Sequence, residues 1–449
     1  MMRAKTSLAG WSPSQARTFA FVDRSLSVAE RSISLRYRLD AFWFTETIVF
    51  PFIADGAIEA HRGSIEAALD ALHWIAGVSY WKAACPPELT FRDRLPDQQQ
   101  AAMLNRLWQG GLAEFAWHNR LDTAVWPRFV GGGKSADSSE MGPLRRRSLV
   151  PMGGGKDSLV AWARLARLGR PADSVQIGSS TLIARLGEQL PSEHWQIERR
   201  IDPLLIELNQ NGALNGHVPV TAINSAILVL AALLMDYDQV VFANERSADE
   251  ATLTNAQGQA VNHQFSKSFE FECLFDDWVR HYIHPGLAVF SLLRRDRELA
   301  ICSEFAQLTE FHPLFSSCNR NFHLDGPRGD RWCGQCPKCH FVFLALAPFL
   351  PRDQLLAIFG HDLLDDPAQQ AGFRALLALD GQKPFECVGE AAEARSAVMA
   401  LANSAEWASC SGLPPLIDAL AGLSVSALSA LCQPSGPHRI PKDLLDASG

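Results

Sequence analysis

The chain has 449 residues, of which 47% are hydrophobic and 20% are charged, so it is long enough to bury a large core and predicts two or three domains. Its formal net charge of −8, without a long basic run, argues against a nucleic-acid backbone as its main partner. The longest apolar run, 226–235, has about half the length that a membrane-spanning helix needs, and the N-terminus lacks the apolar core of a signal peptide, so we expect a cytoplasmic protein without a membrane partner.

Residues 1–120 predict an α+β region. Apolar residues alternate over 33–39 as in a strand, and 42–52 has the pattern of its hairpin partner. Helical spacing follows at 64–77 and 97–117. The region carries no catalytic motif. It could recognise a substrate or act as a lid, and structural packing is the interpretation that we favour.

A polar linker at 121–142 leads into a predicted domain over 143–352. The expected strands of this domain are 147–152, 174–178 and 239–243, and its expected helices are 159–168, 220–236 and 341–350. This alternation predicts an α/β architecture with a doubly wound parallel sheet, in which ligands bind beyond the carboxyl ends of the strands. Residues 353–449, rich in leucine and alanine, predict a helical C-terminal region.

The most informative stretch lies between the first strand of that domain and the helix that follows, at Gly153-Gly154-Gly155-Lys156-Asp157-Ser158. Glycines let the backbone approach a phosphate with its N–H groups pointing inward, and the start of the helix adds a partial positive charge. The stretch therefore predicts a nucleotide site, with a glycine-rich turn without a ligand as the alternative. The Walker pattern fails, because Lys156 is followed by Asp157 and not by serine or threonine.

The glycine loop, residues 153–158, instead resembles the Ser-Gly-Gly-x-Asp-Ser pyrophosphate loop of N-type ATP pyrophosphatases, with Gly153 in place of the first serine. The resemblance implies the adenine nucleotide α-hydrolase type of fold, with ATP and Mg²⁺ bound at the loop. These enzymes cleave ATP between its α- and β-phosphates, which builds charge on the departing pyrophosphate. Lys156 can neutralise that charge as a mobile cation, and Asp157 can hold Mg²⁺.

Polar residues after the strand at 239–243 are further candidates for the site. Glu245 and Asp249 can bind magnesium or a ribose, with a solvated loop as the alternative. His263 and Lys267, four residues apart, would share one face of a helix. Either can transfer a proton, because burial brings both pKa values toward neutrality. For His263 the alternative is a hydrogen-bonded loop histidine.

Four of the ten cysteines are grouped late in the chain: Cys318, Cys333, Cys336 and Cys339. In a reducing compartment such a group favours a metal over disulfides, and cysteines two residues apart in a turn can place both sulfurs on one tetrahedral ion. We expect a closed structural zinc site of four thiolates. His340 or His323 could replace one ligand, and redox chemistry at the cysteine pairs is the alternative.

Three features together resemble the MurL family of UDP-N-acetyl-α-D-muramoyl-L-alanyl-L-glutamate epimerases. They are the glycine loop, the segment Asn262-His263-Gln264-Phe265-Ser266-Lys267-Ser268-Phe269-Glu270, and Trp332-Cys333-Gly334-Gln335-Cys336-Pro337-Lys338-Cys339 running into Phe341-Val342-Phe343. The resemblance extends over most of the chain and is strongest over 147–350. The glycine loop and the cysteines alone also fit 7-cyano-7-deazaguanine synthase, and the segment 262–270 favours the epimerase.

The resemblance implies a purpose for ATP in an isomerase. Transfer of AMP to the terminal carboxylate of UDP-MurNAc-L-Ala-L-Glu removes its charge and makes the neighbouring Cα proton more acidic. A base takes that proton, its return from the other face inverts the centre, and hydrolysis releases AMP. The pathway would be peptidoglycan precursor synthesis, after a Mur ligase that adds L-glutamate. The rival interpretations are an ATP pyrophosphatase that adenylates a substrate for amidation or thiolation, and a zinc-stabilised nucleotide-sensing protein without turnover.

Overall fold

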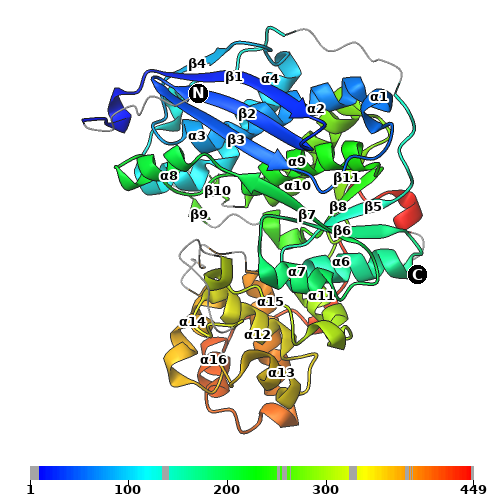
Figure 1. The fold of residues 1–449 in the computed structure, drawn as a ribbon. Coiled ribbons are helices and arrows are strands. Elements are labelled where there is room, and N and C mark those ends of the chain that lie inside the picture. The colour runs from blue at the N-terminus through cyan, green and yellow to red at the C-terminus, as the bar shows by residue number, and fades with distance from the viewer. Residues whose placement is uncertain are drawn as a thin grey trace.

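One nine-stranded sheet runs through the computed structural model, which describes residues 10–133, 141–249, 253–254, 260–262, 264–322, 331–379, 384, 386 and 388–445 (Figure 1). In spatial order its strands are β11 Ala288–Ser291, β8 Gln239–Phe242, β5 Ser148–Pro151, β6 Ala172–Ile177, β7 His194–Arg200, β3 Phe42–Val49, β2 Ser32–Leu39, β1 Thr18–Ser27 and β4 Glu88–Phe91. A separate two-stranded ladder joins β9 Leu253–Thr254 to β10 Ala260–Val261.

The five strands from β11 to β7 are parallel, which confirms the predicted parallel part of the sheet. Along the sequence, β5, β6 and β7 follow one another toward one edge of the parallel part, and β8 and β11 are then added on the other side of β5. This reversal between β5 and β8 makes the sheet doubly wound, and such a switch point is where open α/β sheets bind ligands. The predicted strands 147–152, 174–178 and 239–243 are found as β5, β6 and β8.

The N-terminal strands extend the same sheet, so the sheet is mixed and not purely parallel. The predicted hairpin of 33–39 and 42–52 is confirmed as β2 and β3, with Leu39 opposite Phe42. β3 then pairs antiparallel with β7, and a buried ion pair from Arg199 Nε to Glu46 Oε1 spans this junction at 2.7 Å. Sequence patterns missed the junction because its partners are about 150 residues apart and leave no local signal.

Helices cover both faces of the sheet (Figure 1). On one face and around the N-terminal strands lie α1 Ala57–Ala60, α2 Arg62–Ala76, α3 Val78–Trp81, α4 Gln98–Gly111, α5 Ala113–Asn119, α8 Pro203–Gln210, α9 Val220–Met235 and α10 Phe269–Trp278. On the other lie α6 Lys156–Arg167, α7 Thr181–Gly187 and α11 Glu298–Phe305. The described residues form two hydrophobic cores, the first including α9 and the second including α6 and α11 on the other face of the sheet. Neighbouring residues of β8 point to opposite faces, and accordingly Val240 belongs to the first core and Val241 to the second.

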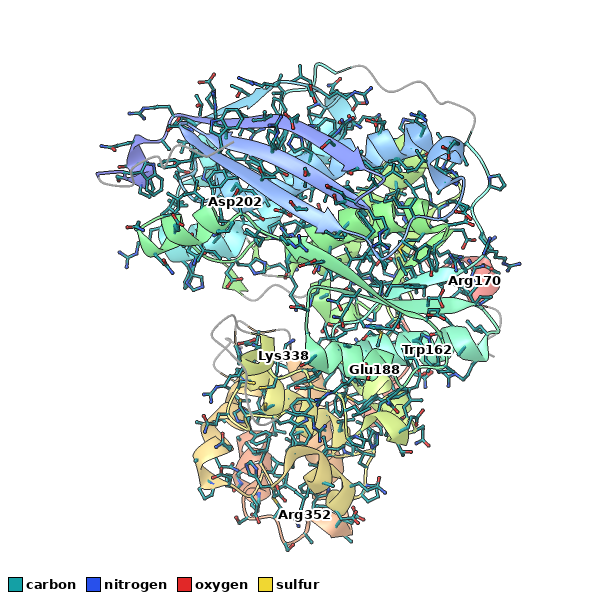
Figure 2. All side chains as sticks on the ribbon, in the orientation of Figure 1. Trp162, Arg170, Glu188, Asp202, Lys338 and Arg352 are labelled. Carbon is teal, nitrogen blue, oxygen red and sulfur yellow. The ribbon has the colours of Figure 1, made fainter. Side chains whose placement is uncertain are left out.

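The predicted helical C-terminal region is confirmed. It comprises α13 Arg352–Phe359, α14 Gln370–Leu376, α15 Ala391–Ala402, α16 Leu413–Ala419 and α17 Leu428–Leu431. α12 Pro337–Leu346 packs against α14 and α15, and these helices share the second core with α6 and α11. Figure 2 labels Lys338, in the first turn of α12, at the end of the helical region that faces the sheet.

Two helix boundaries differ from the sequence-based expectation. The predicted helix 97–117 is divided into α4 and α5 at Leu112, next to Gly110 and Gly111. A Cβ at Gly110 would lie 2.5 Å from the ring of Phe265, so glycine there permits close packing at the cost of helix propensity. The predicted helix 341–350 begins earlier, at Pro337. Among the described residues, no helix has both the length and the hydropathy that a bilayer crossing requires.

Candidate functional site

The glycine loop lies at the switch point, between the end of β5 and the start of α6. Gly154 has φ +83°, a left-handed conformation that favours glycine. Gly155 is the N-cap residue of α6 and has no side chain with which to cap the helix, so the first N–H groups of α6 remain available to a ligand. Gly153 is exposed, with no atom within 4 Å of a Cβ placed there. The loop therefore combines a glycine turn with the N-terminus of a helix, an arrangement that can bind an anion.

Lys156 is buried beneath the loop, with 2% of its side chain exposed. Its Nζ donates to Asp157 Oδ1 at 2.5 Å and also contacts the carboxylate of Glu298, in the first turn of α11. Burial lowers the pKa of Lys156, but the charges of Asp157 and Glu298 outweigh it and raise the pKa well above its ordinary value. We expected a mobile cation, whereas the structure holds this ammonium group in place through its contact with Glu298 of α11.

The acidic candidates occupy different environments. Asp157 keeps 31% of its side chain exposed beside the loop, whereas Glu245 is buried and accepts a hydrogen bond from Ser247 Oγ at 2.8 Å. Burial raises the pKa of Glu298 to about 8, with Lys156 opposing the shift and Glu245 adding to it. Asp249 accepts from the backbone N–H of Phe269 at 2.7 Å and so stabilises the start of α10.

A buried arginine, Arg294, connects the loop after β8 to the segment 262–270. Sequence patterns did not identify it. It is 2% exposed and lies just after β11. Its guanidinium group donates to Glu272 Oε2 at 2.9 and 3.0 Å, to the carbonyl of Glu245 at 3.0 Å and to the carbonyl of Lys267 at 2.7 Å. The loop after β8 and the segment 262–270 are therefore held by one buried cation. An arginine among leucines gave no periodic signal that could have identified it.

The segment 262–270 passes close to the ends of β8 and β11. Phe265–Lys267 form the short 3₁₀ helix η4, with Lys267 half-buried, and His263 lies outside the described residues. A cavity of about 20 Å³ beside η4 has room for about one water molecule. It is lined by Ser225, Phe242, Asn244, Ser266, Ser268, Phe271, Glu272, Phe275, Val289 and Phe290. Burial raises the pKa of Glu272 there, against the opposing charge of Arg294.

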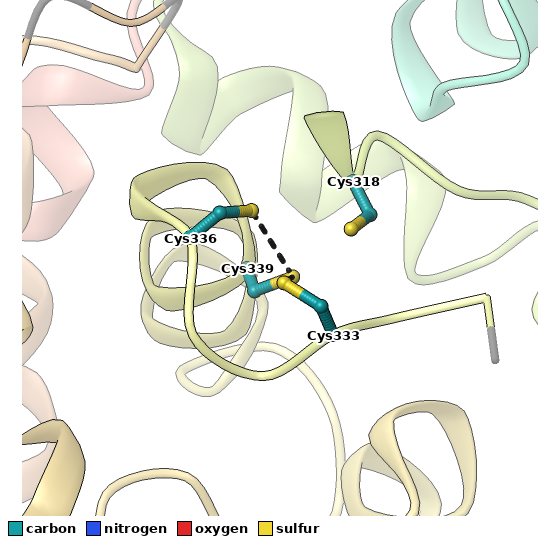
Figure 3. Close-up of side chains that lie close together, drawn as sticks. All are labelled: Cys318, Cys333, Cys336 and Cys339. Carbon is teal, nitrogen blue, oxygen red and sulfur yellow. Dashed lines mark hydrogen bonds between the residues drawn. The ribbon is translucent and has the colours of Figure 1, made fainter. Parts of the chain in front are cut away.

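The four grouped cysteines converge in the structure (Figure 3). Their sulfur atoms all lie within 4.8 Å of one another: Cys318, Cys333, Cys336 and Cys339. The Sγ of Cys339 is 3.7 Å from that of Cys333 and 3.4 Å from that of Cys336. Four thiolates bound tetrahedrally to zinc at about 2.3 Å are separated by ~3.8 Å, so the sulfurs fit that ion without rearrangement of the backbone. Within the described residues this is the group of side chains that suits a metal.

Local geometry explains how the cysteines meet. Gly334 has φ +68°, which turns the chain between Cys333 and Cys336, and Pro337 occupies the first turn of α12. His340 points elsewhere, since its Nε2 hydrogen-bonds Gln369 Oε1 at 3.0 Å. His323, the other alternative ligand, lies outside the described residues.

The cysteine group is joined directly to the glycine loop. The N–H of Ser316 donates to the carbonyl of Gly154 at 2.9 Å, and Ser316 Oγ accepts from the N–H of Cys318 at 3.1 Å. The next residue, Ser317, places its Oγ 2.6 Å from the position that a Cβ of Gly155 would occupy. Sequence reasoning missed both serines, whose only signal was their position before Cys318.

Comparisons with known proteins cover nearly the whole chain. A family model described as the MurL N-terminal domain matches residues 11–292, and one described as the MurL C-terminal domain matches 314–429. A protein of Xanthomonas oryzae pv. oryzae named UDP-N-acetyl-alpha-D-muramoyl-L-alanyl-L-glutamate epimerase is 44% identical over 439 residues, which is 96% of each chain. Proteins of the same name from a Micromonospora species and from Salinispora tropica are each 40% identical, over 408 and 411 residues, or 89% and 90% of this chain and 89% of each relative.

Proposed function

Because the chain belongs to the MurL family, we propose that it is an isomerase that inverts the terminal L-glutamate of UDP-N-acetylmuramoyl-L-alanyl-L-glutamate to D-glutamate. The observation that carries this proposal is the near full-length similarity to relatives named as that epimerase. The reaction belongs to peptidoglycan precursor synthesis, in the cytoplasm, after a Mur ligase that has added L-glutamate.

We propose that the epimerisation consumes ATP bound at the glycine loop. The substrate carboxylate attacks the α-phosphorus of ATP, the bond to the bridging oxygen breaks, and pyrophosphate leaves. In the resulting acyl-adenylate the carboxylate charge is gone, so loss of the Cα proton no longer builds a second negative charge beside the first. The proton returns from the opposite face, and water then cleaves the mixed anhydride to give AMP and the D-epimer.

Different residues of the glycine loop would bind the phosphates and the Mg²⁺ ion. The backbone of Gly153 to Ser158 and the uncapped start of α6 hold the phosphates, which the open space at Gly153 supports. Asp157, partly exposed, holds Mg²⁺, while its neighbour Lys156 keeps the first turn of α6 in place through Glu298. Glu245 and Asp249, which follow the carboxyl end of β8, bind Mg²⁺ or the ribose of ATP.

For proton transfer we propose His263 and Lys267. Both belong to the segment 262–270, and Arg294 holds that segment against the end of β8 through the carbonyl of Lys267. The segment therefore follows the strand ends at which ligands bind in doubly wound sheets. Two groups on opposite faces of the glutamate Cα can remove and return its proton.

We propose that the four cysteines bind a structural zinc ion. A site filled by four protein thiolates leaves no position open for substrate. Its contribution would be to fix the segment 316–318 and, through the hydrogen bond from Ser316, the glycine loop.

One assay tests the proposal. The protein is incubated with UDP-N-acetylmuramoyl-L-alanyl-L-glutamate, ATP and Mg²⁺ in D₂O, and the product is examined for deuterium at the glutamate Cα and for D-glutamate. Both are expected, with release of AMP and pyrophosphate. Absence of deuterium and of D-glutamate would remove the epimerase proposal. AMP release only with another acceptor and ammonia would favour an amidating enzyme, and absence of ATP cleavage would favour a nucleotide-sensing protein.

A further inference from the structure

A side chain from a distant segment lies beside the N-cap residue of α6. Gly155 is the N-cap residue, where serine is among the favoured residues because its hydroxyl meets the first N–H groups of the helix. Here the hydroxyl of Ser317 lies in that space, 2.6 Å from the position of an absent Cβ. Ser317 therefore brings a hydroxyl group to the N-cap position, where Gly155 has no side chain.

The backbone on both sides of Ser317 is anchored. Ser316 donates its N–H to the carbonyl of Gly154, and its hydroxyl donates to the carbonyl of Arg331 at 2.6 Å. On the other side, the N–H of Cys318 donates to Ser316 Oγ, and Cys318 belongs to the cysteine group. Ser317 is held against the loop by these contacts of its neighbours. Within the described residues its own hydroxyl forms no hydrogen bond, although it lies in a half-buried position.

We propose that Ser317 is a phosphate-binding residue whose hydroxyl donates to a nucleotide phosphate in the glycine loop. The inference rests on the proposed binding of ATP. A packing role would be served by any small side chain, whereas a fixed hydroxyl beside a cradle of N–H groups is a further donor to an anion.

The test uses the full-length protein with Mg²⁺ and ATP. Titration calorimetry measures the affinity for ATP, and steady-state kinetics measure the Michaelis constants for ATP and for the dipeptide substrate. Ser317→Ala is expected to weaken ATP binding about tenfold, the size of one charge-assisted hydrogen bond, with the Michaelis constant for the dipeptide substrate and the melting temperature unchanged. Ser14→Ala, at an exposed serine of the N-terminal region, is the control.

The outcomes separate this inference from the proposed function. If the unaltered protein fails to bind ATP, the nucleotide part of the proposed function is overturned and this inference with it. If the unaltered protein binds ATP and Ser317→Ala binds it equally well, only the role of Ser317 is overturned. A loss of affinity that accompanies a lower melting temperature would also overturn it in favour of packing.

Discussion

Lys156 and Glu298 form a buried ion pair that joins the first turn of α6 to the first turn of α11, with 2% and 8% of their side chains exposed. α11 is in turn capped from the C-terminal region, because Glu393 Oε1 accepts a hydrogen bond from the N–H of Leu299 at 2.9 Å. The glycine loop therefore stands at one end of a chain of polar contacts that reaches α15. Buried charges of this kind are costly to leave unpaired, which makes the pair a sensitive point for stability.

Above pH 8, where Glu298 is ionised, replacement of Lys156 by methionine is expected to lower the free energy of unfolding by about 3 kcal/mol, because the carboxylates of Asp157 and Glu298 lose their buried counterion. Urea denaturation monitored by circular dichroism measures the change. Lys442→Met, at an exposed lysine, is the control and should stay within about 0.5 kcal/mol. A Lys156→Met protein of normal stability that no longer binds ATP would instead place this lysine on the phosphates.

Stability is expected to fall as the pH rises toward 8. Burial raises the pKa of Glu298 from its ordinary 4.5 to about 8, so the folded protein holds a proton there that the unfolded chain has lost. The resulting stabilisation is fully present below pH 4.5 and is lost as the pH rises through 8. Burial raises the pKa of Glu393 to about 7, which acts in the same direction.

The neutral variant Glu298→Gln should therefore show a shallower fall in unfolding free energy between pH 5 and 8, by on the order of 2 kcal/mol. Urea denaturation at several pH values provides the comparison, with the exposed Glu59→Gln as the control. An unchanged slope would show that Glu298 stays ionised throughout, paired with Lys156.

Substitution of Gly153 and of Gly155 by alanine should affect ATP binding to different extents. At Gly155 a Cβ would meet Ser317 Oγ at 2.6 Å, so the segment 316–318 must move and ATP binding should weaken about tenfold. At Gly153 a Cβ would meet no protein atom within 4 Å, so Gly153→Ala should leave the segment 316–318 in place and weaken ATP binding less than Gly155→Ala does. Equal effects of the two substitutions, measured by calorimetric titration with ATP, would contradict this steric account.

The cysteine group should couple metal content to nucleotide binding. The protein is expected to hold about one zinc ion per chain, and Cys318→Ser should lose it together with several degrees of melting temperature. ATP affinity should fall as well, because Cys318 anchors the two serines that contact the glycine loop. Elemental analysis, thermal unfolding and ATP titration give the three readouts. Cys432→Ser, outside the group, is the control, and zinc retained by Cys318→Ser would exclude Cys318 as a ligand.

Local sequence patterns predicted those elements whose structure depends on residues close together in the chain. The hairpin of β2 and β3, the strands β5, β6 and β8 and the helices α6 and α9 follow from periodicity over adjacent residues. The glycine loop and the cysteine spacing also lie within short stretches. The same reasoning could not place β3 beside β7 or identify Arg294, whose partners come from three separate segments.

By itself the sequence determined the α/β alternation, the glycine turn of residues 153–158 before a helix and the convergence of four cysteines. These depend on backbone preference and on side-chain types at short spacing. Only the tertiary structure decided that the N-terminal strands extend the parallel sheet, that Lys156 turns inward to Glu298, and that Ser317 lies beside Gly155. Such contacts join residues more than a hundred positions apart, and packing of the whole chain, not local preference, selects them.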